Sequence, residues 1–316
     1  MDLFVAGLAL AGFFGGLALL KSALARLEPF VGPVLRTAVN SPVRGFLAGL
    51  VVTALIQSSS ATNVMAVALV AAGALGLEQA VGIVLGANVG TTATGQLLAF
   101  GTEGAGLVLL AAGLAAQLPG IRRLPAGPAM RVGAWGEAVG GLGAVFLSLW
   151  CLGRALAPVA DGGLLAGYAE AVAVNPGAAL LFGVALTSVV QSSSAVTGLL
   201  IGWADQGGLT LASGIAALLG ANIGTVTTTI LAALPSGTDA RRTAAADALF
   251  NIAGAVAVWP FLGRVEGLVA ALSADPGRQI AHAHTLFNLA TAGLLLPFVH
   301  PFCKLIRWLV PGRRNE

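Results

Sequence analysis

The tetrapeptide Gln57-Ser58-Ser59-Ser60 occurs a second time as Gln191-Ser192-Ser193-Ser194, 134 positions later (57 to 191). The run Gly86-Ala87-Asn88, followed by Gly90-Thr91, recurs at the same offset as Gly220-Ala221-Asn222, followed by Gly224-Thr225. No insertion or deletion separates the two motifs in either copy. The sequence therefore predicts two copies of one structural unit, each built around a Gln-Ser-Ser-Ser motif.

The similarity extends well beyond these motifs. When residues 45–99 are aligned with residues 179–233, 20 of 55 positions are identical. A shorter duplication, at an offset of 37, matches Leu249-Phe250-Asn251 with Leu286-Phe287-Asn288. We predict a single domain over residues 1–316, made of a first repeat, a second repeat and a C-terminal helix pair, at about 3–119, 137–233 and 241–311.

The composition is that of a membrane protein. Apolar residues make up 57% of the chain and charged residues only 9%, and the mean hydropathy is +0.91. Soluble domains contain about 25% charged residues, and apolar stretches of about 20 residues are long enough to cross a bilayer as helices. The predicted fold class is an all-α polytopic membrane protein. Polar side chains at matching places in two membrane repeats indicate a substrate path at the repeat interface.

The apolar segments predict helices near residues 3–25, 79–99, 106–118, 137–157 and 209–233. Two further segments, 45–75 and 177–206, are interrupted at the Gln-Ser-Ser-Ser motifs, and we interpret each as a re-entrant hairpin. The expected connectors are a basic linker, an acidic connector and a basic tail, at 122–131, 161–170 and 304–314.

Charge predicts the orientation, because cytoplasmic loops are enriched in Lys and Arg. With an outside N-terminus, seven full crossings and two hairpins, 13 of the 16 Lys and Arg residues face inward and 3 face outward, namely Arg154, Arg264 and Arg278. The two repeats are then inverted. If each interrupted segment crossed the membrane fully, this asymmetry would be weaker. The basic pI of 9.4 follows from the same loop cations and does not indicate nucleic-acid binding. We expect a multi-pass protein of the plasma (bacterial inner) membrane with a cytoplasmic C-terminus.

The chemistry of the interruptions favours ion binding. Non-helical backbone inside a membrane is tolerated only where protein buries it or where it lines a wet cavity. The free amides at the start of a half-helix bind anions, and hydroxyl and carbonyl oxygens can bind Na+. Gly90-Thr91 and Gly224-Thr225 suggest a second local unwinding or a helix start. The alternative is that these serines serve helix packing, which the duplication of the whole motif makes less attractive.

Ionisable residues are absent from the centres of both interrupted segments, so a carboxylate metal site or proton relay is not predicted there. In the C-terminal pair, Asp247 precedes Asn251 by four residues, as His284 precedes Asn288. These four residues are secondary site candidates. Asp247 should face the protein interior or water, unless it lies at the inner interface near Arg241-Arg242. His284 is expected to pack or to form a hydrogen bond.

At these motifs the chain resembles the type II sodium–phosphate cotransporter family. The resemblance is carried by the paired Gln-Ser-Ser-Ser and Gly-Ala-Asn-x-Gly-Thr motifs and by Ala283-His284-Thr285-Leu286-Phe287-Asn288. It covers nearly the whole chain and implies Na+-coupled movement of inorganic phosphate, with the two Gln-Ser-Ser-Ser regions facing each other. The implied phosphate ligands are Gln57, Ser58, Ser59, Ser60, Gln191, Ser192, Ser193 and Ser194. The implied Na+ ligands, or residues that hold the interruptions open, are Thr62, Asn88, Thr91, Asn222 and Thr225.

The chain also departs from the family pattern. Val196 follows the second motif where Thr62 follows the first, so one half lacks a hydroxyl. Asp247 stands where the family often has a His. Some bacterial relatives carry a cytoplasmic regulatory domain that this sequence does not show, and some of those relatives are thought to export phosphate.

The function predicted from these features is secondary active transport: Na+-coupled symport of phosphate by alternating access, with no catalytic residues and no cofactor besides Na+. A phosphate exporter, a carrier of another oxyanion and an anion channel remain alternatives. An intramembrane hydrolase would need Ser59 paired with His284, but no third orienting group is evident, and the second motif would have no use.

Overall fold

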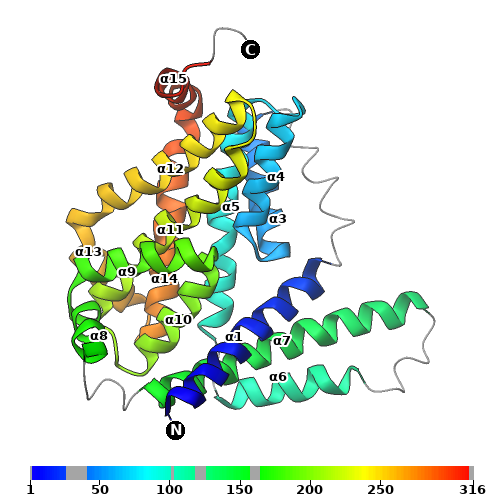
Figure 1. Cartoon of the computed structure of the whole chain (residues 1–316), viewed down its shortest axis with the longest axis vertical. Helices are drawn as coiled ribbons and strands as arrows, with labels where there is room; N and C mark the ends of the chain where they lie inside the picture. Colours follow the sequence, from blue (N-terminus) through cyan, green and yellow to red (C-terminus); the bar gives the residue numbers. More distant parts are fainter. Residues whose placement is uncertain (1, 26–40, 101–102, 118–125, 157–163, 313–316) are drawn as a thin grey trace.

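A computed structural model of the chain describes residues 2–25, 41–100, 103–117, 126–156 and 164–312 (Figure 1). Every regular element within these ranges is a helix, as expected for the all-α class. The α-helices are α1 (Asp2–Ala25), α3 (Pro42–Ile56), α4 (Ser59–Ala71), α5 (Leu77–Leu98), α6 (Glu103–Ala115), α7 (Ala126–Leu156), α8 (Leu164–Val174), α9 (Pro176–Val190), α10 (Ser193–Asp205), α11 (Leu211–Ala233), α12 (Thr238–Val258), α13 (Leu262–Leu272), α14 (Pro276–Leu295) and α15 (Val299–Leu309). Two 3₁₀ turns, η5 (Trp259–Phe261) and η6 (Leu296–Phe298), join α12 to α13 and α14 to α15.

The first interrupted segment consists of α3 and α4. Ser41 starts α3 as its N-cap, accepting a hydrogen bond from the Arg44 amide at 3.2 Å, and Pro42 takes the first turn, where its missing N–H is not needed. Helix α3 ends because Gln57 adopts the left-handed conformation, with φ of 56°. Ser58 then begins α4 as its N-cap. The predicted interruption is confirmed.

The second interrupted segment follows the same local rules. The Asn175 side chain accepts hydrogen bonds from the amides of Gly177 and Ala178 and so starts α9. Gln191, with φ of 56°, ends α9, and Ser192 is the N-cap of α10. The two interruptions therefore occur at matching residues and through matching backbone conformations.

Glycine contacts show that α3 and α5 run parallel. A Cβ atom on Gly82 would overlap the carbonyl group of Pro42, and a Cβ on Gly86 would overlap that of Phe46. Both helices therefore advance in the same direction along their contact. Because α4 returns the chain from the end of α3 to the start of α5, it runs antiparallel to both. The segment α3–α4 thus folds back on itself as a helical hairpin.

Helices α9 and α11 repeat this contact, with Gly220 against the carbonyl of Leu180 and Gly224 against that of Val184. The segment α9–α10 is therefore a second hairpin. The two units have opposite directions: Val67, near the end of α4, packs in one cluster with Ala233 at the end of α11. The end of α11 therefore lies beside the end of α4, at the end of the molecule where α5 begins (Figure 1).

The prediction of a second local unwinding or helix start at Gly90-Thr91 and Gly224-Thr225 is wrong. Helices α5 and α11 continue without interruption through Gly90-Thr91 and Gly224-Thr225. These glycines serve close packing instead: a Cβ on Gly90 would lie 2.6 Å from the Leu50 carbonyl oxygen, and the same holds for Gly224 and Val184. Removing the Cβ lets two helix backbones approach closely, as is common between membrane helices.

Helices α1, α6 and α7 form a separate layer at the end of the molecule where α5 finishes (Figure 1). Phe13 of α1 and Phe146 of α7 pack there in one core with Leu98. Helix α7 begins at Ala126, so the basic linker expected up to residue 131 is partly helical, and α8 begins at Leu164, inside the expected acidic connector.

The C-terminal helix pair predicted at about 241–311 is formed by α12 and α14. The chain does not stop at Pro260 and Pro297 but bends through η5 and η6 into α13 and α15, so much of the expected basic tail is helical. Three described segments are long and apolar enough to cross a membrane: Leu211–Ala233, Thr238–Leu272 and Pro276–Leu309.

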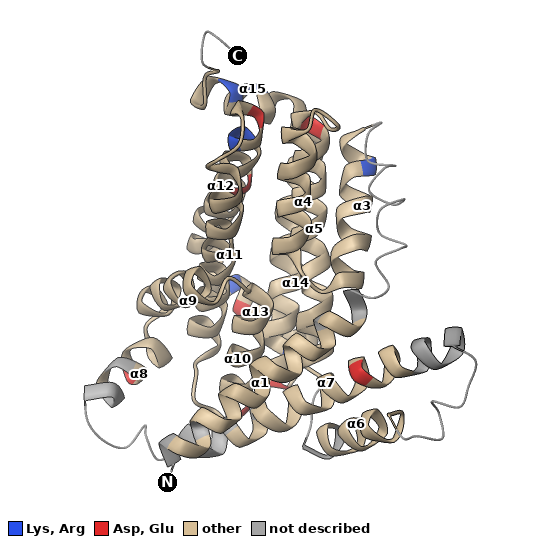
Figure 2. Ribbon diagram, turned by 45° about the vertical axis from the view of Figure 1, so that its right-hand side comes forward, with Lys and Arg blue, Asp and Glu red and all other residues tan. Residues whose placement is uncertain are grey.

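Described cations gather at one end of the molecule (Figure 2). Arg307 of α15 forms an ion pair with Glu78 at the start of α5, with 2.8 Å between nitrogen and oxygen. The Nε atom of Arg242, near the start of α12, donates to the Val310 carbonyl at 2.9 Å. Arg278 lies at the opposite end, with its guanidinium 5.0 Å from the ring centre of Phe100. The end where α3, α5 and α12 begin is thus the more basic one.

Candidate functional site

Gln57 and Gln191 hold the tips of the two hairpins in a strained conformation. Both have φ of 56°, and no other residue except glycine has a positive φ in the described part of the chain. Such a conformation costs on the order of 1–3 kcal/mol and is often found where function requires it. The backbone amides of Gln57 and Gln191 donate to the carbonyls of Thr53 and Thr187, both at 2.7 Å. The two tips therefore have closely matching geometry.

Ser58 and Ser192 act as N-caps. The hydroxyl of Ser58 accepts from the Ala61 amide, and that of Ser192 from the Ala195 amide, both at 3.3 Å. The first four amides of an α-helix have no partner within the helix, and each cap satisfies one of them. The remaining amides, with the positive end of the helix dipole, suit an anion.

The two tips are in contact. The hydroxyl of Ser60, in the first turn of α4, donates to the carbonyl oxygen of Gln191 at 3.2 Å. The side chains of Ser59, Ser193 and Ser194 are buried, with exposed fractions of 7%, 4% and 4%. The Gln-Ser-Ser-Ser regions, 134 positions apart, therefore meet, with these buried serines beside an exposed Gln191. The starts of α4 and α10 come together at this point.

The two repeats differ at one position near the tips, where the first repeat has Thr62 and the second has Val196. In the first half, the Thr53 hydroxyl donates to the Thr62 hydroxyl at 2.8 Å, and the Thr62 hydroxyl donates to the Ser58 carbonyl at 3.1 Å. In the second half, Val196 replaces the second threonine, and the buried Thr187 hydroxyl has no hydrogen-bond partner among the described residues. Thr62 thus links Thr53 of α3 to the backbone of Ser58 at the first tip.

The remaining expected Na+ ligands lie on the uninterrupted helices α5 and α11. The hydroxyls of Thr91 and Thr225 donate to the carbonyls of Ala87 and Ala221, at 3.0 and 2.9 Å. The Asn88 side chain donates to the Val84 carbonyl at 2.9 Å. These bonds use the donor atoms and leave oxygen lone pairs that could face a cation.

Asp247 of α12 lies inside the protein, with an exposed fraction of 2%. Its carboxylate accepts hydrogen bonds from the Thr229 hydroxyl at 2.6 Å, the Asn63 amide at 3.2 Å and the Asn251 amide at 2.9 Å. The Asn88 amide also contacts it. Its side chain therefore faces the protein interior, which is the first of the two placements expected for it.

Sequence reasoning missed Asn63 and Thr229. The available signal was polarity at a fixed helical spacing: Asn63 lies four residues after Ser59, on the same face of α4. Thr229 carried no comparable signal, because its counterpart in the first repeat is Gly95.

The corresponding place in the second half holds no carboxylate. His284 and Asn288 of α14 are buried, and the Asn288 amide donates to the His284 carbonyl at 2.9 Å. A Cβ atom on Gly95 would lie 3.4 Å from both the His284 Nδ1 atom and a methyl of Thr197. Thr197 is the counterpart of Asn63, so the two halves bring matching residues together with different chemistry. Neither the Nδ1 atom of His284 nor the side-chain nitrogen of Asn222 has a partner among the described residues.

Comparison with protein families agrees with this architecture. The family model described as Na+/Pi-cotransporter matches residues 13–154 and again residues 152–296. The chain belongs to the Na+/Pi-cotransporter family. The two successive matches correspond to most of the described helices, including both hairpins.

Several curated members of the family are similar to this chain. "Uncharacterized protein YqeW" of Bacillus subtilis (strain 168) is 33% identical over 276 residues, which are 87% of each chain. "Putative inorganic phosphate export protein YjbB" of Escherichia coli (strain K12) is 29% identical over 86% of this chain, which spans 50% of that protein. "Sodium-dependent phosphate transport protein 2A" of Oryctolagus cuniculus is 34% identical over 43% of this chain and 22% of its own length. No solved structure matches the chain.

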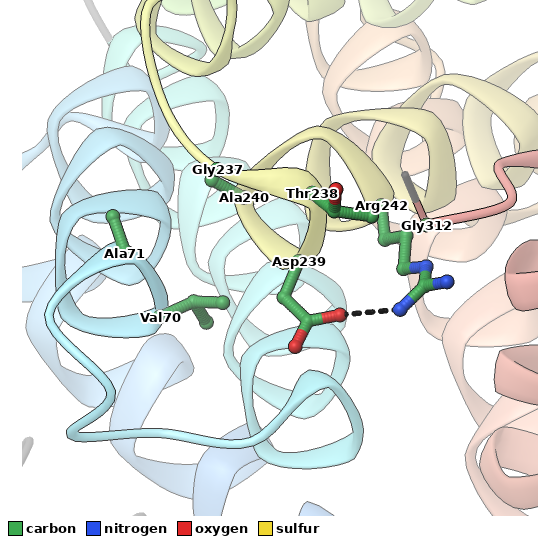
Figure 3. Close-up of a pocket in the computed structure, with 8 residues that line it drawn as sticks. All are labelled: Val70, Ala71, Gly237, Thr238, Asp239, Ala240, Arg242 and Gly312. Atoms are coloured by element: carbon green, nitrogen blue, oxygen red, sulfur yellow. Dashed lines mark hydrogen bonds and ion pairs between the residues drawn. The ribbon is translucent and has the colours of Figure 1, made fainter. Parts of the chain in front are cut away.

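A hollow in this family member lies between the end of α4 and the start of α12 (Figure 3). Its polar wall is the ion pair between Arg242 and Asp239, at 2.7 Å, and Arg242 also bonds the Val310 carbonyl. These charges are already paired with each other, so the hollow does not offer an unpaired Arg242 to an anion. The hollow is lined by Val70, Ala71, Gly237, Thr238, Asp239, Ala240, Arg242 and Gly312.

Proposed function

We propose that this protein is a secondary active transporter that couples the movement of inorganic phosphate to Na+ by alternating access. The observation that carries the proposal is the contact between two hairpin tips, at which the N-termini of α4 and α10 meet. Membership of the Na+/Pi-cotransporter family supports the substrate. The names of two relatives, one a sodium-dependent phosphate transport protein and one a phosphate export protein, support it further.

The tips suit an oxyanion that must be released again. Serine hydroxyls, glutamine amides and free helix amides all donate hydrogen bonds, and neither tip sequence contains Lys or Arg. The phosphate ligands in this proposal are Gln57, Ser58, Ser59, Ser60, Gln191, Ser192, Ser193 and Ser194. A mobile cation then has to offset the charge of the anion inside the membrane. Oxygens for Na+ come from Thr62, Asn88, Thr91, Asn222 and Thr225.

Alternating access would use the inverted arrangement of the two repeats. Gln57 is buried while its counterpart Gln191 is exposed, so the two tips are in unequal environments. In a pair of inverted repeats, exchange of these environments opens the site to the opposite face. The model of seven crossings and two hairpins, with the basic end in the cytoplasm and the N-terminus outside, gives this exchange a direction across the membrane.

Uptake by proteoliposomes tests the function. With the purified chain in vesicles, radiolabelled phosphate should accumulate when an inward Na+ gradient is applied, and uptake should saturate. Accumulation without Na+ dependence would reject the coupling, and flux that does not saturate would favour an anion channel. Because one relative is named as a phosphate exporter, efflux should be measured with the gradient reversed.

The orientation can be tested with a matched pair of serines. Ser236 lies between α11 and α12, and Ser273 lies between α13 and α14, at opposite ends of the molecule. With Cys151 and Cys303 replaced, an impermeant thiol reagent should label Ser273→Cys in intact cells and Ser236→Cys only after permeabilisation. The reverse pattern would invert the proposed topology.

A further inference from the structure

Asp247 is a buried carboxylate whose identified partners are all neutral. Thr229, Asn63 and Asn251 donate hydrogen bonds to it, and no ion pair with Asp247 occurs among the described side chains. Removing an unpaired charge from water is costly unless another charge compensates it. Within a membrane, ionisable residues in the protein interior often mark ion pathways. The carboxylate therefore lacks a positive partner.

Two further oxygen atoms in this cluster also lack a partner. The side-chain oxygens of Asn63 and Asn251 are buried and have no hydrogen bond within the described structure. Each amide nitrogen bonds the Asp247 carboxylate. Since the oxygen and nitrogen of an amide share one carbon, both oxygens lie close to the same carboxylate. Buried acceptors without donors are rare in proteins and call for an explanation.

We infer that Asp247, Asn63 and Asn251 form a binding site for one Na+ ion. The inference rests on the proposed function and adds to it a Na+ site that is separate from the oxygens of Thr62, Asn88, Thr91, Asn222 and Thr225. One carboxylate with neutral oxygens suits a monovalent ion, whereas Ca²⁺ and Mg²⁺ usually take more than one charged ligand or keep several waters. No group of three or more His, Cys, Asp or Glu side chains suited to a metal was found among the described residues. Thr229, which donates to the carboxylate, fixes its orientation.

The position of this site links it to the hairpin tip. Asn63 follows Ser59 by four residues on α4, which corresponds to a rise of about 6 Å along the helix. A cation held by Asn63 and Asp247 would therefore lie about one helical turn from an anion at the start of α4. The second half has His284 and Thr197 at the matching places, so it lacks the carboxylate that attracts a cation.

Direct Na+ binding tests this inference without phosphate. The full chain, purified in detergent, should bind radioactive Na+ saturably when choline maintains the ionic strength. Asp247→Asn should weaken binding at this site at least about 30-fold, which corresponds to about 2 kcal/mol. Asn63→Ala should weaken it about 10-fold through loss of one ligand oxygen. Asp239→Asn, on the same helix but exposed, is the matched control and should bind as the unmodified protein does.

The outcomes separate this inference from the proposed function. If folded Asp247→Asn protein, judged by size exclusion and thermal melting, binds Na+ with unchanged affinity and stoichiometry, the inference is rejected. If that variant does not fold, unchanged binding by Asn63→Ala rejects it instead. If Na+ binding requires Asp247 but the unmodified protein transports no phosphate, the site stands and the proposed function falls.

Discussion

The hydroxyl of Ser60 donates a hydrogen bond to the carbonyl oxygen of Gln191 at 3.2 Å, and this bond joins the tips of the two hairpins. The equivalent bond from Ser194 to the Gln57 carbonyl is not formed, and Ser194 is more deeply buried than Ser60. The contact is thus asymmetric although the two sequences are identical. Two equal tips in unequal surroundings are what a site that alternates between two faces requires.

Removal of the central serine hydroxyls should impair phosphate binding. Ser59→Ala and Ser193→Ala each remove a buried donor at the meeting point of the tips. A hydrogen bond to a charged group contributes about 1.5–3 kcal/mol, so we expect the affinity to fall roughly 10- to 150-fold. Phosphate uptake at subsaturating concentration measures this. Ser236→Ala, at the end of α11, is the control, and near-normal uptake by both tip variants would remove the serines from the site.

Val196→Thr should stabilise the protein. The added hydroxyl would stand where Thr62 stands in the first half and could accept a hydrogen bond from the unpartnered Thr187 hydroxyl, as Thr62 does from Thr53. One such bond contributes about 0.5–1.5 kcal/mol. The melting temperature in detergent should rise. The reciprocal change, Thr62→Val, should lower it, because the buried Thr53 hydroxyl would lose its partner. A lower melting temperature for Val196→Thr would contradict this account.

Na+ and phosphate should each raise the affinity for the other by the same factor. Unit charges about 4–6 Å apart, at an effective dielectric constant near 20, attract by roughly 3–4 kcal/mol before desolvation opposes them. A net coupling of about 1–3 kcal/mol is therefore expected. Calorimetric titration of phosphate at two Na+ concentrations, with choline as the balancing cation, measures it. Asp247→Asn should reduce the coupling, and equal phosphate affinities at about 1 and about 100 mM Na+ would exclude Na+ as the coupling ion.

The second half should gain a cation site if it receives the side chains of the first. The double variant Thr197→Asn with His284→Asp reproduces Asn63 and Asp247 at their counterpart positions. We expect one additional Na+ bound per chain, measured with radioactive Na+ in the absence of phosphate. Thr197→Asn alone, which adds no charge, should leave the stoichiometry unchanged. If the folded double variant binds no extra ion either, a carboxylate and an amide at these two positions are not sufficient to bind Na+.

The stability of the protein should depend on pH through the carboxyl group of Asp205. Its Oδ1 atom accepts from the Gly277 amide at 2.7 Å, where the second hairpin meets α14. Desolvation of this carboxyl and the nearby charge of Asp275 raise its pKa from 3.8 to about 6. The folded state then binds the proton more tightly than the unfolded state, so the contribution of this group to stability falls as pH rises from about 4 to about 6.

Asp205→Asn should remove that dependence, because the neutral amide can still accept the hydrogen bond from Gly277. We expect its melting temperature to exceed that of the unmodified protein at neutral pH and to differ little near pH 4. Asp239→Asn provides a comparison, since it removes a carboxylate that is paired with Arg242. If Asp205→Asn changes the melting temperature by the same amount at both pH values, ionisation of Asp205 does not affect stability.

Much of the fold could be predicted from local sequence. The Gln-Ser-Ser-Ser motifs mark both helix interruptions, because Ser58 and Ser192 cap a new helix directly after a residue that leaves the helical conformation. The smaller duplication could also be read from the sequence, because Asn251 follows Asp247 as Asn288 follows His284, by four residues. Each of these pairs is buried in the structure. These features depend on neighbours within a turn or on composition, so one sequence is sufficient to find them.

The tertiary structure decided the rest. In the sequence, Gly90 and Gly224 are compatible with a helix interruption and with a close helix contact. Only the backbones of α3 and α9 beside them show that they serve close contacts. Asn63 and Thr229 lie 184 and 18 positions from Asp247 and have no sequence pattern in common with it, yet both donate to its carboxylate. Whether a buried polar side chain is paired or left to bind an ion depends on what neighbouring helices bring to it, and that is a property of packing alone.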